Sequence, residues 1–368
     1  MSADTELQEL AATVRAVLTK HGDQTVLRRA IDGELGYDEQ LWTLLCEQVG
    51  VAALAIPEEF GGVGAGLPAA LLVVEELGRT LQAPPMLGSA VLGAQAVLLS
   101  GNAAACERLL PEVAEGTRTL SLCWAGPSGG DNPGIQVENG TLTGTAHYVL
   151  DGASADTLIV LTDDGLYEID AAAPEVTRAS TATMDPSRRL AEITCTAAAG
   201  RALGGDPATV TARLREIAWA ALAAEQVGAA DQCLAATVDY TNSRVQFGRA
   251  IGSFQALKHR MADMYVLVES ARSTAYAAIA ALPDTTVVPT GDGPATPVTA
   301  TPHPDAALDL ASARIHCSDT FRTVAGEMIQ MHGGIAITWE HEAHLYFKRA
   351  HADAELFGTP ARPLTRPA

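Results

Sequence analysis

The spacing of apolar residues predicts helices through the first third of the chain. Three runs place their apolar side chains at intervals of three and four residues, which puts them on one face of a helix. A stretch before the third run contains a proline and closely spaced glycines, as is typical of a loop. The runs are marked by Leu7, Leu10, Val14 and Leu18, by Leu41, Leu44, Leu45 and Val49, and by Leu71, Val74, Leu77 and Leu81, and the loop by Pro57, Gly61, Gly62, Gly64 and Gly66. We therefore predict an N-terminal helical domain over residues 1–116.

From about Thr117 the apolar residues alternate with polar ones, which is the period of a β-strand. Short runs such as TLSLCWAG, TLIVLT and LAEITCT are separated by residues that favour turns. Asn139-Gly140 and Asp164-Gly165 lie between such runs and are typical of two-residue hairpin turns. Several short strands at this spacing predict a small antiparallel barrel or sandwich. We assign this central β domain to residues 117–206.

Helical spacing returns at about Pro207 and predicts a C-terminal helical bundle over residues 207–368. A long alanine-rich run is typical of closely packed helices, and a second helix is expected from about Ser253 to Leu282. The segment 283–304 is rich in proline and threonine, so we expect a long, mobile and dispensable loop there. Two further helices are expected before and after Gly333-Gly334, and the last residues should be extended.

Composition narrows the classes of function. The net charge of −20 leaves no basic surplus to bind nucleic acid. The chain has no apolar run of bilayer-spanning length, and its acidic first helix lacks the pattern of a signal peptide, so we predict no membrane partner. Its six scattered cysteines form no metal-ligand pattern and indicate a reducing environment. We therefore expect a cytoplasmic protein without a metal site.

The segment from Arg244 to Met264 reads RVQFGRAIGSFQALKHRMADM. It resembles the RxQFGxxIxxFQxxxHxxADM segment of the acyl-CoA dehydrogenase family, whose order of a helical domain, a β domain and a four-helix bundle also matches. The resemblance implies that this segment reaches across a subunit interface to the pyrophosphate and adenine of FAD. Arg244 would pair with phosphate, Gln246 and Gln255 would donate hydrogen bonds, and Phe247 would face a ring. The alternative is that Phe247 and Phe254 only anchor a helical hairpin.

A second resemblance lies in GEMIQMHGGIAI, residues 326–337, which is similar to the QxxGGxG turn of the same family. It implies that Gln330, Gly333 and Gly334 lie against the adenosine of FAD, since paired glycines let a ligand approach the backbone closely. Ala336 stands where the family usually has a third glycine. We interpret His332 as a polar residue of the turn, without a special role.

The β domain departs from the family pattern. Residues 126–131, GPSGGD, keep the small-residue turn of the TEPxAGSD loop but lack its acidic residue and threonine. Tyr148 stands where the family has a tryptophan, and no threonine follows to meet the flavin. We expect Arg188 and Arg189 to form a surface pair in the third β landmark. The fold signal is thus retained while the flavin contacts are altered.

The family also needs a carboxylate base to remove a proton from the acyl thioester. We expect it about ten residues after the paired glycines, and a gap-free count from Gly334 reaches His344. His344 could accept a proton near neutral pH or could be one more polar helix residue. Glu340 and Glu342 are nearby and are expected to be surface carboxylates. The alternative base position on the first bundle helix coincides with Ala218, and Glu216 beside it belongs to the solvated side.

Two functions therefore stay open. In the first, the chain is an active dehydrogenase that converts an acyl-CoA to the 2-enoyl-CoA and passes electrons to an electron-transfer flavoprotein. In the second, it is a non-catalytic partner that completes the FAD site of a heteromeric enzyme, similar to the smaller subunits of actinobacterial steroid dehydrogenases. Either would be a homo- or heterotetramer in fatty acid or steroid catabolism. A purely structural helical protein would leave the RVQFG segment as coincidence.

Overall fold

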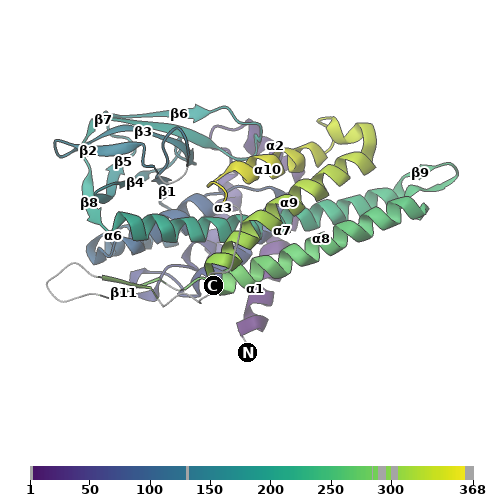
Figure 1. Cartoon of the computed structure of the whole chain (residues 1–368), viewed down its shortest axis with the longest axis horizontal. Coiled ribbons are helices and arrows are strands. Elements are labelled where there is room, and N and C mark those ends of the chain that lie inside the picture. Colours follow the sequence, from purple (N-terminus) through teal and green to yellow (C-terminus); the bar gives the residue numbers. More distant parts are fainter. Residues whose placement is uncertain (1–2, 130–131, 284, 289–295, 300–305, 361–368) are drawn as a thin grey trace.

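The computed structural model describes residues 3–129, 132–283, 285–288, 296–299 and 306–360, with a sandwich of two sheets packed beside the helices of both helical parts (Figure 1). The chain is mainly α, as predicted. No helix among the described residues is long and apolar enough to cross a membrane. The N-terminal elements are α1 (Ala3–His21), α2 (Gln24–Asp32), α3 (Glu39–Val49), the 3₁₀ turns η1 (Val51–Ala53) and η2 (Glu58–Phe60), α4 (Gly66–Thr80), the π-helix η3 (Met86–Gly93), α5 (Ala94–Leu99) and α6 (Ala103–Ala114).

Local sequence explains where the first helices begin and end. The carboxylates of Asp23 and Asp38 accept hydrogen bonds from backbone N–H groups that open α2 and α3. Gly50 ends α3 in the left-handed conformation. The predicted glycine loop packs tightly, because a Cβ at Gly62 would lie 1.9 Å from the carbonyl oxygen of Ile56.

The central domain is a sandwich of two four-stranded sheets. One sheet has the order β1-β4-β5-β8 and the other β2-β3-β7-β6. Both predicted two-residue turns are present, since Glu138 pairs with Thr141 and Thr162 pairs with Gly165. All pairings within the sandwich are antiparallel except that of β1 with β4, which is parallel. The strands are β1 (Leu120–Cys123), β2 (Ile135–Glu138), β3 (Thr141–Leu150), β4 (Thr157–Thr162), β5 (Gly165–Asp170), β6 (Val176–Thr181), β7 (Leu190–Ala198) and β8 (Arg201–Gly204).

Four long helices make the C-terminal bundle. The helix α7 packs against α4, α8 and α9, and α9 also contacts α10. A small hairpin of β9 and β10 joins α7 to α8 and projects from the end of the bundle away from the β domain (Figure 1). The elements are α7 (Pro207–Ser243), β9 (Val245–Gln246), β10 (Arg249–Ala250), η4 (Ile251–Ser253), α8 (Gln255–Ala280), β11 (Thr285–Val288), β12 (Thr296–Thr299), α9 (Ala306–His332), η5 (Gly333–Ile337) and α10 (Ala343–Glu355).

Two stretches of the segment 283–304 are more ordered than its composition predicts. The strands β11 and β12 pair antiparallel, with Thr285 opposite Thr299 and Val288 opposite Thr296. The prediction of a loop without secondary structure is therefore wrong for these two stretches, because β-branched residues on both sides favour pairing despite the prolines. The rest of the predicted mobile loop, residues 284, 289–295 and 300–304, lies outside the described residues, as does the predicted extended tail from residue 361 onward.

The helices α4 and α7 cross at a pair of glycines. A Cβ at Gly228 of α7 would lie 1.9 Å from the carbonyl oxygen of Glu75, and a Cβ at Gly78 of α4 would lie 2.3 Å from that of Glu225. The two backbones can approach this closely only because neither glycine has a side chain. This crossing fixes the N-terminal helices against the bundle.

Replacing Gly228 with alanine should therefore destabilise the protein by about 1–3 kcal/mol, because the helices must separate to admit the methyl group. The matched control is Gly326→Ala in α9, where a Cβ would meet no heavy atom within 4 Å among the described residues. There the higher helix propensity of alanine should leave stability equal or slightly higher. Denaturant unfolding followed by circular dichroism measures both, and equal midpoints for the two variants would contradict the assignment.

Candidate functional site

The RVQFG segment forms the exposed hairpin at the far end of the bundle. Arg244 ends α7, Gln246 pairs with Arg249, and the turn residues Phe247 and Gly248 both have positive φ values of 54° and 77°. Positive φ is unusual for an aromatic residue and is often found at functional positions. The side chain of Phe247 is 92% exposed. The alternative interpretation of Phe247 as a core anchor is therefore wrong.

The remaining groups of this segment also face solvent. Arg244, Gln246 and Gln255 are exposed, and the Gln246 side-chain amide donates to the Val245 carbonyl oxygen, at 2.8 Å. Phe254 is half-buried, with the guanidinium of Arg249 4.0 Å from its ring centre. The hairpin thus presents cations, amides and an aromatic face together.

The Gly-Gly turn lies at the same end of the bundle. Gln330, Gly333 and Gly334 are exposed. Gly333 has a φ of 66°, which explains its glycine, whereas Gly334 has an ordinary φ and nothing within 4 Å of its Cβ position among the described residues. The packing of the described chain therefore gives no reason for a glycine at position 334. Close approach by a group outside the chain would give one.

A buried aromatic stack joins the two motifs. The ring of His332 lies 4.2 Å from that of Tyr240, one turn before Arg244, and its Nδ1 is 2.8 Å from the Met328 carbonyl oxygen. Burial lowers the pKa of His332. His332 is thus a buried residue that packs the ends of α7 and α9 together, and its lack of a functional role stays a prediction.

An exposed apolar strip follows the Gly-Gly turn. Ile335, Ile337 and Trp339 alternate along the chain and keep large exposed areas. The centre of the Trp339 ring lies 4.7 Å from that of the His344 ring and 4.9 Å from the Nζ of Lys348. This strip extends the apolar surface of the motif end beyond Phe247.

His344 lies beneath Trp339 and is buried. Its Nε2 has no hydrogen-bond partner among the described residues, and burial, reinforced by the charge of Lys348, lowers its pKa. Glu340 is exposed as predicted. Glu342 is half-buried, and burial raises its pKa, so the prediction of a surface carboxylate is wrong there. The role of His344 as a base stays a prediction.

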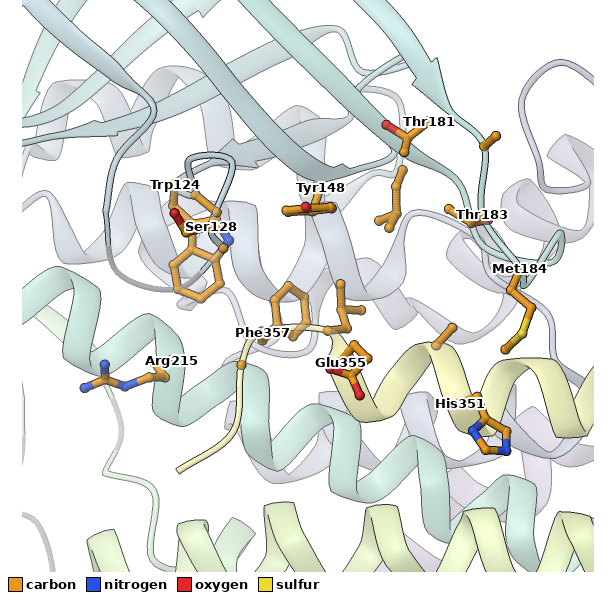
Figure 2. Close-up of a pocket in the computed structure, with 17 residues that line it drawn as sticks. Trp124, Ser128, Tyr148, Thr181, Thr183, Met184, Arg215, His351, Glu355 and Phe357 are labelled. Carbon is orange, nitrogen blue, oxygen red and sulfur yellow. The ribbon is translucent and has the colours of Figure 1, made fainter. Parts of the chain in front are cut away.

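A cavity lies elsewhere, between the β domain and the helices α7 and α10 (Figure 2). Its volume is about 610 Å³. Aromatic rings dominate one side, where Trp124 and Phe357 meet edge to face at 5.6 Å. His344 is not part of the lining, which consists of Trp124, Ala125, Ser128, Gly129, Tyr148, Thr181, Ala182, Thr183, Met184, Leu190, Arg215, His351, Ala352, Glu355, Leu356, Phe357 and Gly358.

Two cavity residues adopt the left-handed backbone conformation. Tyr148 has a φ of 57° at an irregularity of β3, and its hydroxyl donates to the Pro127 carbonyl oxygen at 3.2 Å. Phe357 has a φ of 59° just after α10. Both rings border the cavity (Figure 2). Of the GPSGGD loop, Ser128 and Gly129 line the cavity, while residues 130 and 131 lie outside the described residues.

Besides the phenol of Tyr148, the ionisable groups of the lining are Arg215, His351 and Glu355. His351 and Glu355 are one helical turn apart on α10, and the Glu355 side chain is exposed at the cavity. A carboxylate beside aromatic walls can accept a proton from a bound molecule. Sequence reasoning missed these residues, because no motif marks them. Ala218, the alternative base position, is fully buried, and Glu216 is half-buried and pairs with Arg213 at 2.9 Å.

Behind the cavity, Arg188 and Arg189 are not the predicted surface pair. Arg188 is buried and its Nη2 donates to both carboxylate oxygens of Glu225 at 2.5 Å. The Nη2 of Arg189 donates to the carbonyl oxygens of Ile31 and Gly33, which ties the β domain to the end of α2. The prediction failed because both guanidinium groups find acceptors that are distant in the sequence.

Known proteins match over the whole chain. The acyl-CoA dehydrogenase N-terminal domain matches residues 4–117, and the acyl-CoA dehydrogenase C-terminal domain matches residues 217–362. The acyl-CoA dehydrogenase IpdE2 of Mycobacterium tuberculosis is 40% identical over 369 residues, covering 100% of this chain and 97% of the relative. IpdE2 of Mycolicibacterium smegmatis is 42% identical over 366 residues, covering 100% and 98%.

Solved structures agree. A variant of the Tcur3481-Tcur3483 steroid ACAD has a TM-score of 0.83 at 30% identity, covering 97% of this chain and 95% of that chain. The ChsE4-ChsE5 complex from Mycobacterium tuberculosis has a TM-score of 0.83 at 27% identity, covering 98% and 94%. With both domains matched and relatives similar along their full length, the chain belongs to the acyl-CoA dehydrogenase family.

Proposed function

We propose that this chain is one subunit of a heteromeric, FAD-dependent acyl-CoA dehydrogenase. The assembly would oxidise the α,β bond of an acyl-CoA thioester to the 2-enoyl-CoA and pass the electrons to an electron-transfer flavoprotein. This chain would complete the adenosine end of an FAD site whose flavin ring and base belong to a related subunit. Two similar solved structures carry the names of two proteins, Tcur3481-Tcur3483 and ChsE4-ChsE5, which supports a mixed assembly here.

One observation carries the proposal: the cavity and the hairpin with Arg244, which are the two parts of the expected FAD site, lie far apart along the long axis of the molecule. Arg215 lines the cavity near the start of α7, and Arg244 ends the same helix. At about 1.5 Å per residue, the helix separates them by roughly 44 Å, which is longer than an extended FAD. Figure 1 shows the hairpin and the β domain at the two ends of the long axis. A single chain therefore could not hold both ends of one FAD with these residues, which supports a cofactor shared with another subunit.

The residues at the motif end fit the adenosine half of FAD. Arg244 offers a fixed cation for the pyrophosphate, the exposed amides of Gln246 and Gln330 offer hydrogen bonds, and Phe247 offers a ring face. Gly334 has no side chain, so a cofactor could approach its backbone closely, whereas no neighbour among the described residues requires a glycine there. When bound, FAD supplies the acceptor for a hydride from the acyl chain. The apolar strip beyond the turn would exclude water from the contact.

A second candidate function is catalysis by this chain in its own cavity. The specific observation in its favour is the exposed carboxylate of Glu355, which lines a cavity large enough for a ligand. Glu355 would then be the base, with His351 one turn away. In either case we expect a cytoplasmic enzyme of steroid or fatty acid catabolism, as part of a tetramer.

The isolated chain should oxidise acyl-CoA substrates weakly or not at all, and a co-expressed homologous subunit should restore turnover. The expected deficit is at least the 10²–10⁴-fold that general-base catalysis contributes. Steady-state assays over a panel of acyl-CoAs with a ferrocenium acceptor measure it. Ordinary turnover by the chain alone would rule out the helper role.

Arg244→Ala should weaken flavin binding in the assembled enzyme by about 1.5–3 kcal/mol, the usual worth of a hydrogen bond to a charged group. Arg201→Ala removes an exposed arginine in β8, away from the motif end, and serves as the matched control. Flavin content of the purified assemblies, from their absorption spectra, separates the two. Equal flavin content in both variants would show that Arg244 does not contact FAD.

If the base lies in the partner, Glu355→Gln and His344→Ala should each change the turnover of the assembled enzyme by no more than about twofold. A carboxamide cannot take up the proton, so loss of a true base lowers kcat by about 10²–10⁴-fold. Such a loss for Glu355→Gln, with KM little changed, would favour the second candidate. The same loss for His344→Ala would assign the base to His344.

A further inference from the structure

A cluster of buried charges lies where the three parts of the chain meet. Its members come from the turn after β3, from the loop before β7, from α7 and from α10, and all are buried. We name it the junction cluster. It consists of the guanidinium groups of Arg188 and Arg349 and the carboxyl groups of Asp151, Asp185, Glu225 and Asp353.

Two of the carboxylates are matched directly to the two cations. Arg349 lies 2.5 Å from Asp185 and 2.7 Å from Glu225, and Arg188 lies 2.5 Å from Glu225. Burial raises the pKa of Asp185, but the charge of Arg349 and hydrogen bonds from Ser187 outweigh burial and lower it. Asp185 and Glu225 therefore balance Arg188 and Arg349.

The other two carboxyl groups lack such partners. Neither carboxylate oxygen of Asp353 has a hydrogen-bond partner among the described residues, and the nearest cation, Arg188, is 3.7 Å away. Asp353 is fully buried and Asp151 nearly so. Burial raises the pKa of each to about 7, against the opposing charges of Arg188 and Arg349. An uncompensated buried carboxylate is costly, so a proton is the simplest source of neutrality.

The surroundings do not supply the missing positive charge. On α9, Arg314 faces Asp353, but its Nη2 donates to the backbone carbonyl oxygens of Asp353, Ala354 and Leu356. The phenol of Tyr37 is the further ionisable group near Asp151, and it offers no cation. Even with Arg314 counted, the carboxyl groups outnumber the guanidinium groups.

The junction cluster forms the back of the cavity walls. On α10, Arg349 and Asp353 point into the cluster, while His351 and Glu355 on the other face line the cavity. The loop before β7 lines the cavity up to Met184 and enters the cluster at Asp185. The end of β3 also lines the cavity and then enters the cluster.

There, Tyr148 borders the cavity, and Asp151 lies beside Arg188 and Glu225 at a small internal space. Three separate wall segments are thus each anchored within four residues of the cavity. A shift of the cluster would move all three walls together.

We propose that the junction cluster positions the walls of this cavity and that it does so with protons held on Asp353 and Asp151. Both residues are positioning residues, and neither belongs to the lining of the cavity. The importance of the cavity for catalysis rests on the proposed function, whereas the held protons do not.

The sign of the pH effect follows from proton linkage. Unfolded aspartates titrate near pH 4, whereas these two titrate at about 7 in the folded chain. Between these values the folded state holds protons that the unfolded state has released. The folding equilibrium constant should therefore fall about tenfold per pH unit for each aspartate as the pH rises from 5 to 7, and should level off above that range.

The test is Asp353→Asn, alone and with Asp151→Asn, because asparagine mimics the neutral acid in size and charge. Each substitution should flatten the decline in stability between pH 5 and 8, and at pH 8 the double variant should be more stable than the wild type. Asp163→Asn, at an exposed position, is the matched control and should keep the wild-type slope. Denaturant midpoints measured across this pH range report the slopes.

Two direct measurements complete the test. Infrared difference spectra between pH 6 and 8 should show a protonated carboxyl band that disappears in the double variant. Hydrogen exchange, corrected for the intrinsic rate, should rise in residues 181–190 and 343–356 of the wild type above pH 7 and not in Asp353→Asn. Wild-type pH slopes in both variants, or no carboxyl band, would overturn the proposal. These readouts use the purified chain or its complex without added flavin, so a failure of the proposed enzyme activity would leave them unaffected.

Discussion

The contacts of one side chain, Glu225, hold the parts of the molecule in register. Its carboxylate accepts hydrogen bonds from Arg188 of the β domain and from Arg349 of α10. Its own backbone carbonyl is the atom that Gly78 of α4 approaches at the helix crossing. One residue of α7 thus contacts all three parts. Removing one partner of such a buried pair typically costs 3–5 kcal/mol, because the other charge stays buried without compensation.

A charged junction has a geometric consequence that an apolar one lacks. Apolar contacts tolerate sliding, whereas the hydrogen bonds of a guanidinium to a carboxylate fix both distance and direction. Arg349 contacts Asp185, Glu225 and the carbonyl and hydroxyl of Ser187, so α10 can occupy one position relative to the β domain. The positions of the cavity walls are fixed by the same hydrogen bonds. The charged junction also contains more carboxyl groups than guanidinium groups, so its protonation should change with pH.

The order of helices, strands and helices could be predicted from the hydrophobic period, and the turns at Asn139-Gly140 and Asp164-Gly165 from their residue types. The burial of Arg188 could not, since its acceptor Glu225 lies in another part of the chain and hydropathy favours an exposed arginine pair. Glu355 and Phe357 were missed for the same reason: only the packing of α10 against the sandwich brings them to the cavity. The residues of the RVQFG segment are exposed, and their proposed contact with FAD would require a second subunit.

The proposed contact with a second subunit would account for how little the described chain constrains the residues of the motif end. Phe247 keeps a positive φ and an almost fully exposed ring, and Gly334 keeps a glycine that no neighbour requires. A smaller, polar residue at position 247 would suit a monomer better, because an exposed aromatic ring contributes to stability only when another surface covers it. The cavity, by contrast, is fixed from behind by buried charges. The cavity is therefore suited to a ligand held within one chain, and the motif end to a surface completed by another chain.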